Sequence, residues 1–451
     1  MIEGILIGLN TALSLKNILM VMIGCFAGTI IGMLPGLGPM TAIALMIPIT
    51  YGFEPSTGLI LMAGVYYGAV FGGSTSSILI NAPGVPGTVA TSFDGYPMAQ
   101  QGKAGKALAI AAYSSFAGGT IAAIFLLFAA PSLSKVSLAF RSPDYFGLMI
   151  LGLTAVSAFS AKGHFLKAMM MVVLGLMLAS VGQDTLSDIP RFVFNNMNLA
   201  DGISFVLVVM ATFAMSEALT IIFKGSDPTQ AAKQISLSKL GSIKLDKEET
   251  KKMVTTIPRS SIIGFIIGVL PGAGSTIASF LAYGMERNFV KDEEKLKFGK
   301  GSVNGLSAPE TANNAACSGS FVPLLTLGIP GSGTTAVMLG ALLGFGIQPG
   351  PRLYQTNPEI FWSVIMSMYI GMVILLILNL PLIPYIARIL AVPRAFLIPL
   401  ILFFSVTGIY LMSFNNFDIF LMIGIAVVAT ILRLYDFPMP PLILAFVLGG
   451  L

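Results

Sequence analysis

Charged residues are scarce in this sequence: they make up 10% of its 451 residues, whereas hydrophobic residues make up 55%. Soluble domains carry about 25% charged residues, so most soluble folds are excluded. A helix that crosses a hydrocarbon core of about 30 Å needs about 20 mainly apolar residues, and such stretches recur from Leu15 to the end of the chain. The composition therefore predicts an all-α polytopic membrane protein with about ten to twelve membrane segments.

Cysteine and histidine are also nearly absent. Cys25 and Cys317 each lie in an apolar stretch, so they indicate no disulfide framework. The single histidine, His164, lies between Lys162 and Lys167 in a short connection, where a solvated loop residue is expected. There is no phosphate-binding Gly-Lys-Ser/Thr motif, and the glycine-rich runs do not follow a soluble strand. The sequence thus predicts neither an enzyme nor a bound cofactor.

An internal repeat organises the chain. Residues 28–42 (GTIIGMLPGLGPMTA) and 264–278 (GFIIGVLPGAGSTIA) are identical at nine of fifteen positions. A second, weaker pair follows each copy, because residues 72–88 and 319–335 share two glycines, a proline and a threonine. Each motif interrupts an apolar stretch with a Pro-Gly pair. The repeat predicts four broken helices, two in each half of the chain.

Lysine and arginine in the connections predict the orientation of the spans. The connections at Lys103 and Lys162 and the segment 224–258 fall on one side by alternation, and the positive-inside rule makes that side cytoplasmic. We therefore divide the chain into a first half (1–223), a cytoplasmic linker (224–258) and a second half (259–451). The ordinary spans expected between and after the motifs are Ala107–Ala130, Tyr145–Ser160, Phe165–Val181, Ile203–Phe223, Phe361–Ile383, Ala395–Met412 and Phe417–Leu432.

The segment from Arg259 to Arg287 is basic at both ends and is interrupted halfway at Pro271-Gly272. About twelve helical residues reach roughly 18 Å, so the turn is expected near the middle of the bilayer. This pattern predicts a re-entrant hairpin that enters from the cytoplasm. Because successive spans cross the membrane in alternating directions, the motif of the first half is expected to enter from the outside. The two repeats are therefore expected to have inverted topology. For the first copy, residues 16–54 fit either a hairpin or a full span followed by a half helix.

Irregular backbone at membrane depth is tolerated only where it is buried in protein or lines a watery cavity. The half helices present N–H groups to an anion, and freed carbonyls suit Na⁺, although no particular sodium ligands are indicated. The alternative is that the small residues only allow close helix packing. The residues predicted to bind a carboxylate at the breaks are Gly36, Gly38, Ser74, Thr75, Asn81, Pro83, Gly84, Thr88, Gly272, Gly274, Ser275, Thr276, Asn313, Asn314, Ser318, Pro330, Gly331, Ser332 and Thr334.

Two acidic residues lie at membrane depth, where an ionisable side chain indicates function because its burial is costly. Glu310 is near a break and beside two asparagines, so it is a candidate either for coupling to Na⁺ or H⁺ or for capping the start of a helix. Glu217 lies seven residues before Lys224 and is a candidate for ion coupling or for an interfacial role.

The long motifs resemble those of the large integral membrane (permease) subunit of the tripartite tricarboxylate transporters. The resemblance covers nearly the whole chain and is carried by residues 32–39, 72–108, 268–274 and 308–342. It implies uptake of a carboxylate such as citrate across the cell (inner) membrane, driven by an ion gradient. It also implies two partners, a small membrane subunit and an extracytoplasmic solute-binding protein. A carrier that acts alone, or a passive channel, is the alternative.

Overall fold

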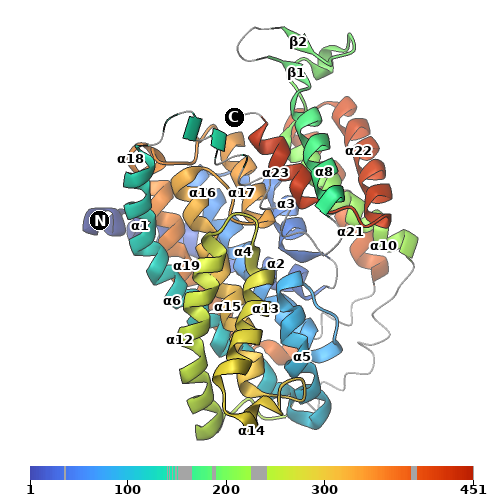
Figure 1. The fold of residues 1–451 in the computed structure, drawn as a ribbon. Coiled ribbons are helices and arrows are strands. Elements are labelled where there is room, and N and C mark those ends of the chain that lie inside the picture. Colours follow the sequence, from blue (N-terminus) through green and yellow to red (C-terminus); the bar gives the residue numbers. More distant parts are fainter. Residues whose placement is uncertain are drawn as a thin grey trace.

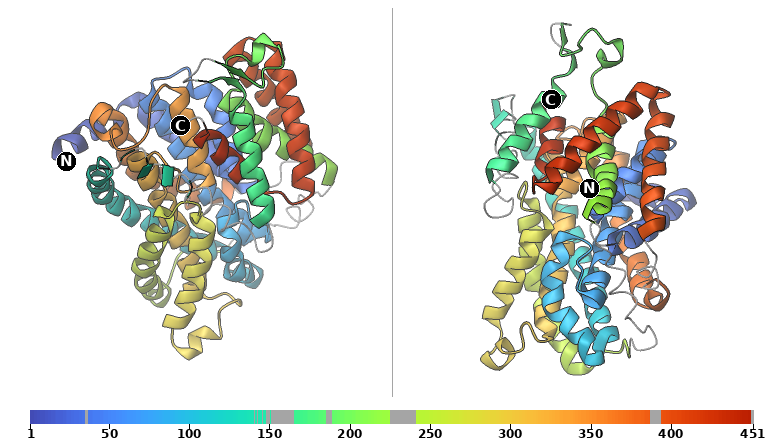
Figure 2. Two further views of the ribbon diagram at one scale, coloured as in Figure 1. Left: turned by 45° about the horizontal axis from the view of Figure 1, so that its top comes forward. Right: turned by 90° about the vertical axis from the view of Figure 1, so that its right-hand side faces the viewer.

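The computed structural model describes residues 1–34, 37–139, 165–184, 189–224, 241–386 and 394–449, together with residues 141, 143, 144, 146, 147 and 150. Within these residues, seven helices are long and apolar enough to cross a membrane, and five further apolar helices have 10–17 residues. Helices pack around one another throughout, and a small hairpin of two strands projects at one end (Figures 1 and 2). The chain is an all-α polytopic membrane protein.

The first half begins with two helices separated by a capped turn, where the Ser14 side chain accepts the backbone N–H of Asn17 at 3.3 Å. Helix α2 has 19 residues, the length of a full span, and α3 has 13. The elements are α1 (Ile2–Ala12), α2 (Leu15–Met33), α3 (Gly38–Thr50), α4 (Pro55–Ile80), η1 (Pro86–Thr88), α5 (Val89–Met98), η2 (Ala99–Lys103) and α6 (Ala104–Ser137).

The middle of the chain contains the strand hairpin, in which Gly182 pairs with Arg191 in antiparallel register. Three of the four spans expected between the motifs coincide with α6, with α8 and with the continuous stretch α9–η4–α10. The fourth, 145–160, lies almost entirely outside the described residues. The elements are α8 (Phe165–Ala179), β1 (Gly182–Gln183), β2 (Pro190–Arg191), η3 (Met197–Leu199), α9 (Phe205–Val209), η4 (Met210–Met215) and α10 (Ser216–Lys224).

The helix that leads into the second-half hairpin begins before Arg259. A capping box between Asp246 and Glu249 starts α12 at Lys247, so the last part of the segment expected to be a linker is helical. The elements are α12 (Lys247–Val269), α13 (Gly274–Phe289), α14 (Asp292–Lys295), α15 (Val303–Gly319), α16 (Phe321–Leu327), α17 (Gly333–Gly344), α18 (Leu353–Thr356), α19 (Pro358–Asn379), α20 (Ile383–Ile386), α21 (Arg394–Ser413), α22 (Asn416–Leu434) and α23 (Pro440–Leu448).

Helices α12 and α13 form an antiparallel pair that enters and leaves at the same end of the molecule, next to α14 at the bottom of Figure 1. The turn between them needs glycine, because Gly272 and Gly274 have φ angles of +80° and +61°. Both helices pack on α15, which is buried along nearly its whole length. The chain therefore returns on itself at Pro271, as the basic flanks indicated.

The first motif of each half packs in the same way on the helix that carries the second motif, so α2 packs on α4 and α12 packs on α15. A Cβ atom added at Gly32 in α2 would lie 2.0 Å from the carbonyl oxygen of Ala69 in α4. At the matching Gly268 in α12, the added atom would lie 2.3 Å from the carbonyl oxygen of Ala316 in α15. Ala69 and Ala316 are themselves matching positions, at the spacing that aligns the second pair of motifs.

The second pair of motifs repeats this correspondence at the breaks themselves. The backbone of Gly84 approaches the carbonyl oxygen of Gly32, and the backbone of Gly331 approaches that of Gly268. A Cβ atom at Gly84 would lie 1.8 Å from the oxygen of Gly32, and one at Gly331 would lie 2.9 Å from that of Gly268. In both halves, therefore, the second break packs on the helix before the first break.

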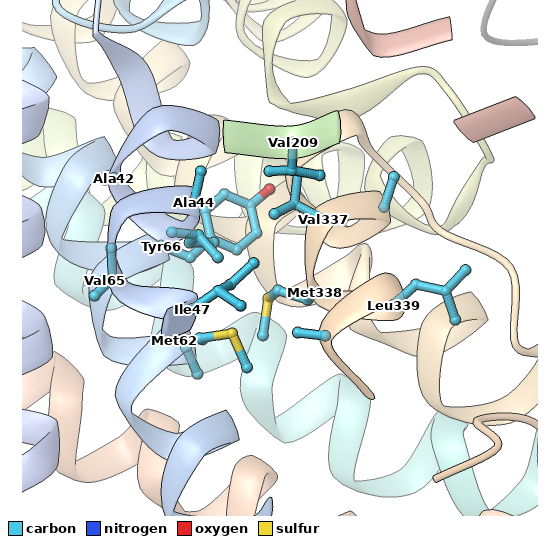
Figure 3. Packing of buried hydrophobic residues seen from close by; sticks show 14 of the residues in the cluster. Ala42, Ala44, Ile47, Met62, Val65, Tyr66, Val209, Val337, Met338 and Leu339 are labelled. Atoms are coloured by element: carbon cyan, nitrogen blue, oxygen red, sulfur yellow. The ribbon is translucent and has the colours of Figure 1, made fainter. Parts of the chain in front are cut away.

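The two halves interlock through their broken helices. Helix α17 of the second half contacts α3 and α4 of the first, and η1 of the first half contacts α13 and α15 of the second. Figure 3 shows side chains of α3, α4, α9 and α17 directed into one buried hydrophobic cluster. Those labelled there are Ala42, Ala44, Ile47, Met62, Val65, Tyr66, Val209, Val337, Met338 and Leu339.

Candidate functional site

The first-half break and the second-half hairpin meet at Gly87. A Cβ atom at this position would lie 2.5 Å from Oδ1 of Asn313 and 2.8 Å from Oγ of Ser275. Three elements, η1, α13 and α15, thus converge on a point where only a backbone without a side chain fits. Ser275 and Asn313 were predicted from the sequence but Gly87 was not, although this glycine lies inside the second motif as the residue before Thr88.

The side chain of Asn313 is fully buried, and neither its amide nitrogen nor its amide oxygen has a hydrogen-bond partner among the described residues. An unpaired buried polar group costs about 1–3 kcal/mol, so two such atoms on one side chain are unfavourable unless a ligand satisfies them. The neighbouring Asn314 donates its Nδ2 hydrogen to the carbonyl of Glu310 at 3.1 Å, within its own helix. Asn313 therefore offers a donor and an acceptor at the junction.

The start of α13 faces the same junction. The first N–H groups of a helix have no partner within the helix and favour an anion, and Ser275 and Thr276 in this first turn are half-buried. The turn is held in place from outside, because the N–H of Gly272 donates to the carbonyl of Gly331 at 3.1 Å. Pro330, just before Gly331, is buried. The two second-half breaks are thus joined to each other by a backbone hydrogen bond.

The repeat places a matching junction at the start of α17, and there a tyrosine of the first half supplies a hydrogen-bonding hydroxyl. Ser332 caps α17 in a reciprocal pair with Thr335, and its hydroxyl lies 3.3 Å from that of Tyr66 in α4. Tyr66 is the position in α4 that matches Asn313 in α15. Thr334, in the first turn of α17, is buried. A phenol hydroxyl therefore completes this junction, whereas at Asn313 the amide is left without a protein partner.

Several of the candidate polar residues have hydrogen bonds that hold the broken ends. The hydroxyls of Thr88 and Ser77 are 2.8 Å apart, and those of Ser318 and Tyr67 are 2.7 Å apart. Asn81 ends α4 in a left-handed conformation with φ of +51° and is exposed. The structure thus separates residues that position the breaks from Asn313, whose side chain has no such bond.

Glu310 lies in the middle of α15 and is fully buried. Its carboxylate accepts hydrogen bonds from Ser74 in α4 and Ser115 in α6, both at 2.8 Å, and from the hydroxyl of Thr91 in α5. The alternative that Glu310 caps a helix start is wrong, because α15 begins at Val303, where Ser302 is the cap. Four helices are therefore joined at one carboxylate, whose partners within the described residues are hydroxyls.

The space next to this carboxylate is small. Thr75 lines it together with Ser74 and Ser115, and its volume is about 10 Å³, which is the room of about one water molecule. Within the described part of the chain, no three His, Cys, Asp or Glu side chains come together as a metal site. A space of this volume admits a water molecule or a small ion but not an organic acid.

A larger cavity of about 610 Å³ opens at the first-half breaks, lined by Gly38, Pro83 and Gly84. Glu217 and Arg433 also line it and form an ion pair there. Arg433 additionally donates from Nη2 to the carbonyl of Thr212 at 2.9 Å. The candidate Gly36 lies outside the described residues. Arg433 was not predicted from the sequence as a site residue, and it comes directly after the expected span Phe417–Leu432.

The sequence model of the Tripartite tricarboxylate transporter TctA family matches residues 18–444, nearly the whole chain. The chain belongs to the TctA family. The resemblance that the motifs indicated is thereby confirmed, and this TctA member is a multi-pass membrane protein of a transporter family rather than an enzyme. Membership implies that it works together with other subunits of a tripartite transporter.

Two relatives from Agrobacterium vitis are similar to this TctA member. One, "Uncharacterized 52.8 kDa protein in TAR-I ttuC' 3'region", is 42% identical over 451 residues, which is 100% of this chain and 88% of the relative. The other, "Uncharacterized protein in TAR-II ttuC' 3'region", is 43% identical over 188 residues, which is 42% of this chain and 77% of the relative. No solved structure shows a significant match to the chain.

Proposed function

We propose that the chain is the permease subunit of an ion-gradient-driven tripartite uptake system for di- or tricarboxylates such as citrate, located in the cell (inner) membrane. The substrate is held near the midplane between the two halves, at the tips of the broken helices. The observation that carries this proposal is Asn313, a buried amide without a partner in the described chain, at the point where η1 and the start of α13 meet. A small membrane subunit and an extracytoplasmic solute-binding protein deliver the substrate to this subunit.

The two halves act as inverted-topology repeats, divided at 1–223, 224–258 and 259–451. Support comes from the paired close contacts, since Gly32 and Gly268 approach matching carbonyls and Gly84 and Gly331 approach those two glycines. Inverted repeats place substrate and ion sites at their shared interface, where half-helix N-termini face an anion and freed carbonyls face Na⁺. The interlocked contacts of η1 with α13, and of α17 with α3, lie at that interface.

Glu310 couples transport to the ion. Its carboxylate holds either Na⁺ or a proton against the hydroxyls of Ser74, Thr91 and Ser115. These hydroxyls lie on α4, α5 and α6, and Glu310 is three residues before Asn313 on α15, so the two groups are neighbours on one helix face. Occupancy at Glu310 therefore affects the position of the helix that carries the substrate-binding amide.

The test of this function is uptake of labelled citrate, succinate and tartrate by proteoliposomes that contain the permease and its small membrane subunit, with binding protein outside. Uptake of at least one carboxylate is expected only with a Na⁺ or H⁺ gradient and only with the binding protein present. Equal uptake without any gradient would exclude ion coupling and favour a passive channel. Gradient-driven uptake without the other two subunits would identify a carrier that acts alone.

Replacing Asn313 with leucine distinguishes a role of this side chain in substrate binding from a role in folding. Leucine has nearly the shape of asparagine and removes two unpaired buried polar atoms, so the unfolding temperature is expected to stay the same or rise. Carboxylate uptake is expected to fall more than tenfold, because the donor and the acceptor at the junction are both lost. Uptake and thermal unfolding are measured on the same preparation. Wild-type uptake by N313L would show that the amide does not contact substrate.

A further inference from the structure

We infer that Arg433 binds one carboxylate of the transported acid, and that Glu217 occupies the same guanidinium when no substrate is bound. This inference rests on the proposed function and adds a charged anchor to it. In the described structure the two side chains form an ion pair in the wall of the 610 Å³ cavity, which Gly38 and Gly84 of the first-half breaks also line. The cavity has the volume of a small-molecule site.

The electrostatics of the cavity favour an anion at this place. Arg433 and Glu217 are the charged residues among the described residues that line it, and the rest of the wall is formed mainly by proline, glycine and apolar side chains. A carboxylate that leaves water at membrane depth needs a partner of opposite charge. Arginine presents its donors as a planar fork that matches a carboxylate, and it keeps its charge in such surroundings.

Arg433 has donor capacity that the protein does not use. Its Nη1 binds Glu217 and its Nη2 binds the carbonyl of Thr212, but its Nε–H is shielded from solvent and has no partner among the described residues. The whole side chain is 20% exposed, and that of Glu217 is 12% exposed. The guanidinium is therefore held in place from two directions, and the donor that an incoming carboxylate would use is Nη1, which Glu217 occupies here.

A second cavity explains where Glu217 can move. It has a volume of about 330 Å³ and is lined by Glu217 and Arg433 together with Thr220, Lys224 and Asp436. Lys224 is seven residues after Glu217 on α10, which is two helical turns along the same face. When a substrate carboxylate binds Arg433, the carboxylate of Glu217 turns towards Lys224, so the negative charge of Glu217 is still paired with a positive one. The ion pair thus stands between the cavity at the breaks and a second cavity at the lysine end of α10.

Uptake kinetics of single and double variants test this assignment in the reconstituted system. E217Q removes the internal competitor and keeps the side-chain shape, so the KM for the transported carboxylate is expected to fall at least threefold. R433Q, and the neutral pair E217Q/R433Q, are expected to lose more than tenfold in uptake. The double variant leaves no uncompensated charge, and its elution in size-exclusion chromatography shows whether it folds.

The matched control is K106Q/E249Q, which neutralises an ion pair of 2.8 Å whose side chains are similarly exposed, at 26% and 15%, and which does not line the cavity. Its KM is expected to equal that of the wild type. A folded E217Q/R433Q variant with wild-type KM would overturn the assignment. A second readout, thermal unfolding with citrate, does not depend on ion coupling or on the partner subunits. Citrate is expected to raise the unfolding temperature of the wild-type chain but not that of the double variant. An equal rise in both would also overturn the assignment of Arg433.

A wild type that takes up no carboxylate at all would instead contradict the proposed function. The citrate-induced shift then decides the role of Arg433 by itself, because a shift that depends on Arg433 still identifies the guanidinium as the carboxylate anchor. The two failures are therefore distinguishable.

Discussion

Replacing Glu310 with glutamine is expected to reduce ion-driven carboxylate uptake more than a hundredfold while leaving the protein folded. Glutamine keeps the length of the side chain and still accepts hydrogen bonds from Ser74 and Ser115, which both lie 2.8 Å from the carboxylate. It carries no charge and takes up no proton, so it can neither pair with Na⁺ nor be neutralised by H⁺. Uptake is measured in proteoliposomes under an imposed gradient, and folding is measured by thermal unfolding.

Two further variants show which property of Glu310 matters. E310A removes the acceptor of three buried hydroxyls, of which Ser74 keeps the carbonyl of Val70 at 3.3 Å as a second acceptor. The hydroxyls of Thr91 and Ser115 are left unpaired at about 1–3 kcal/mol each, so both stability and uptake are expected to be lost. E359Q serves as the control, since Glu359 is in the first turn of α19 and its hydrogen bond with Thr11 is exposed. Gradient-driven uptake by E310Q at the wild-type rate would exclude Glu310 as the coupling residue.

Replacing Gly32 with alanine is expected to prevent accumulation of folded protein. The added Cβ would lie 2.0 Å from the backbone oxygen of Ala69, and a backbone atom cannot move aside as a flexible side chain can. The helices α2 and α4, which pack along their length, would have to separate, at a cost above the 1–3 kcal/mol that is usual for overpacking. The yield of monodisperse protein and its unfolding temperature measure the effect.

The repeat makes a matching prediction for the second half. G268A is expected to have a similar effect, because its Cβ would lie 2.3 Å from the oxygen of Ala316. In contrast, G424A in α22 meets no atom within 4 Å and is expected to stabilise the helix by about 0.5–1 kcal/mol. Normal yields of G32A and G268A would contradict the close helix packing on which the paired breaks depend.

The positions of the broken helices could be predicted from the sequence because proline and glycine act locally. Helix α12 ends at Val269 and α13 begins at Gly274, around the predicted turn at Pro271. Three of the four spans between the motifs could also be predicted, because the length of an apolar stretch decides whether it can cross the membrane. The start of α12 was not, because its first residues are charged and resemble a solvated linker, whereas the capping box at Asp246 makes them helical.

The candidate site was predicted only in part. One of the two roles predicted for Glu310 was to cap a helix start, because it lies near a break, yet it lies in the middle of α15, which begins at Val303. The contact between Gly87 and Asn313 joins residues far apart in the chain, and no local pattern indicates it. Arg433 follows an apolar stretch and therefore resembles an interfacial residue. Its pairing with Glu217 depends on how α10 and α22 pack.

The most direct test of the central claim, that substrate lies where the broken helices of the two halves meet, is protection of a cysteine at Ser275. The native Cys25 and Cys317 are buried, so S275C provides the reactive thiol at the junction, and G284C, further along α13 with open space around it, is the control. The rate of modification by a small charged thiosulfonate is measured with and without the transported carboxylate and its coupling ion. The account predicts at least a fivefold slower reaction of S275C with substrate and no change at G284C. Equal rates at S275C with and without substrate would contradict it.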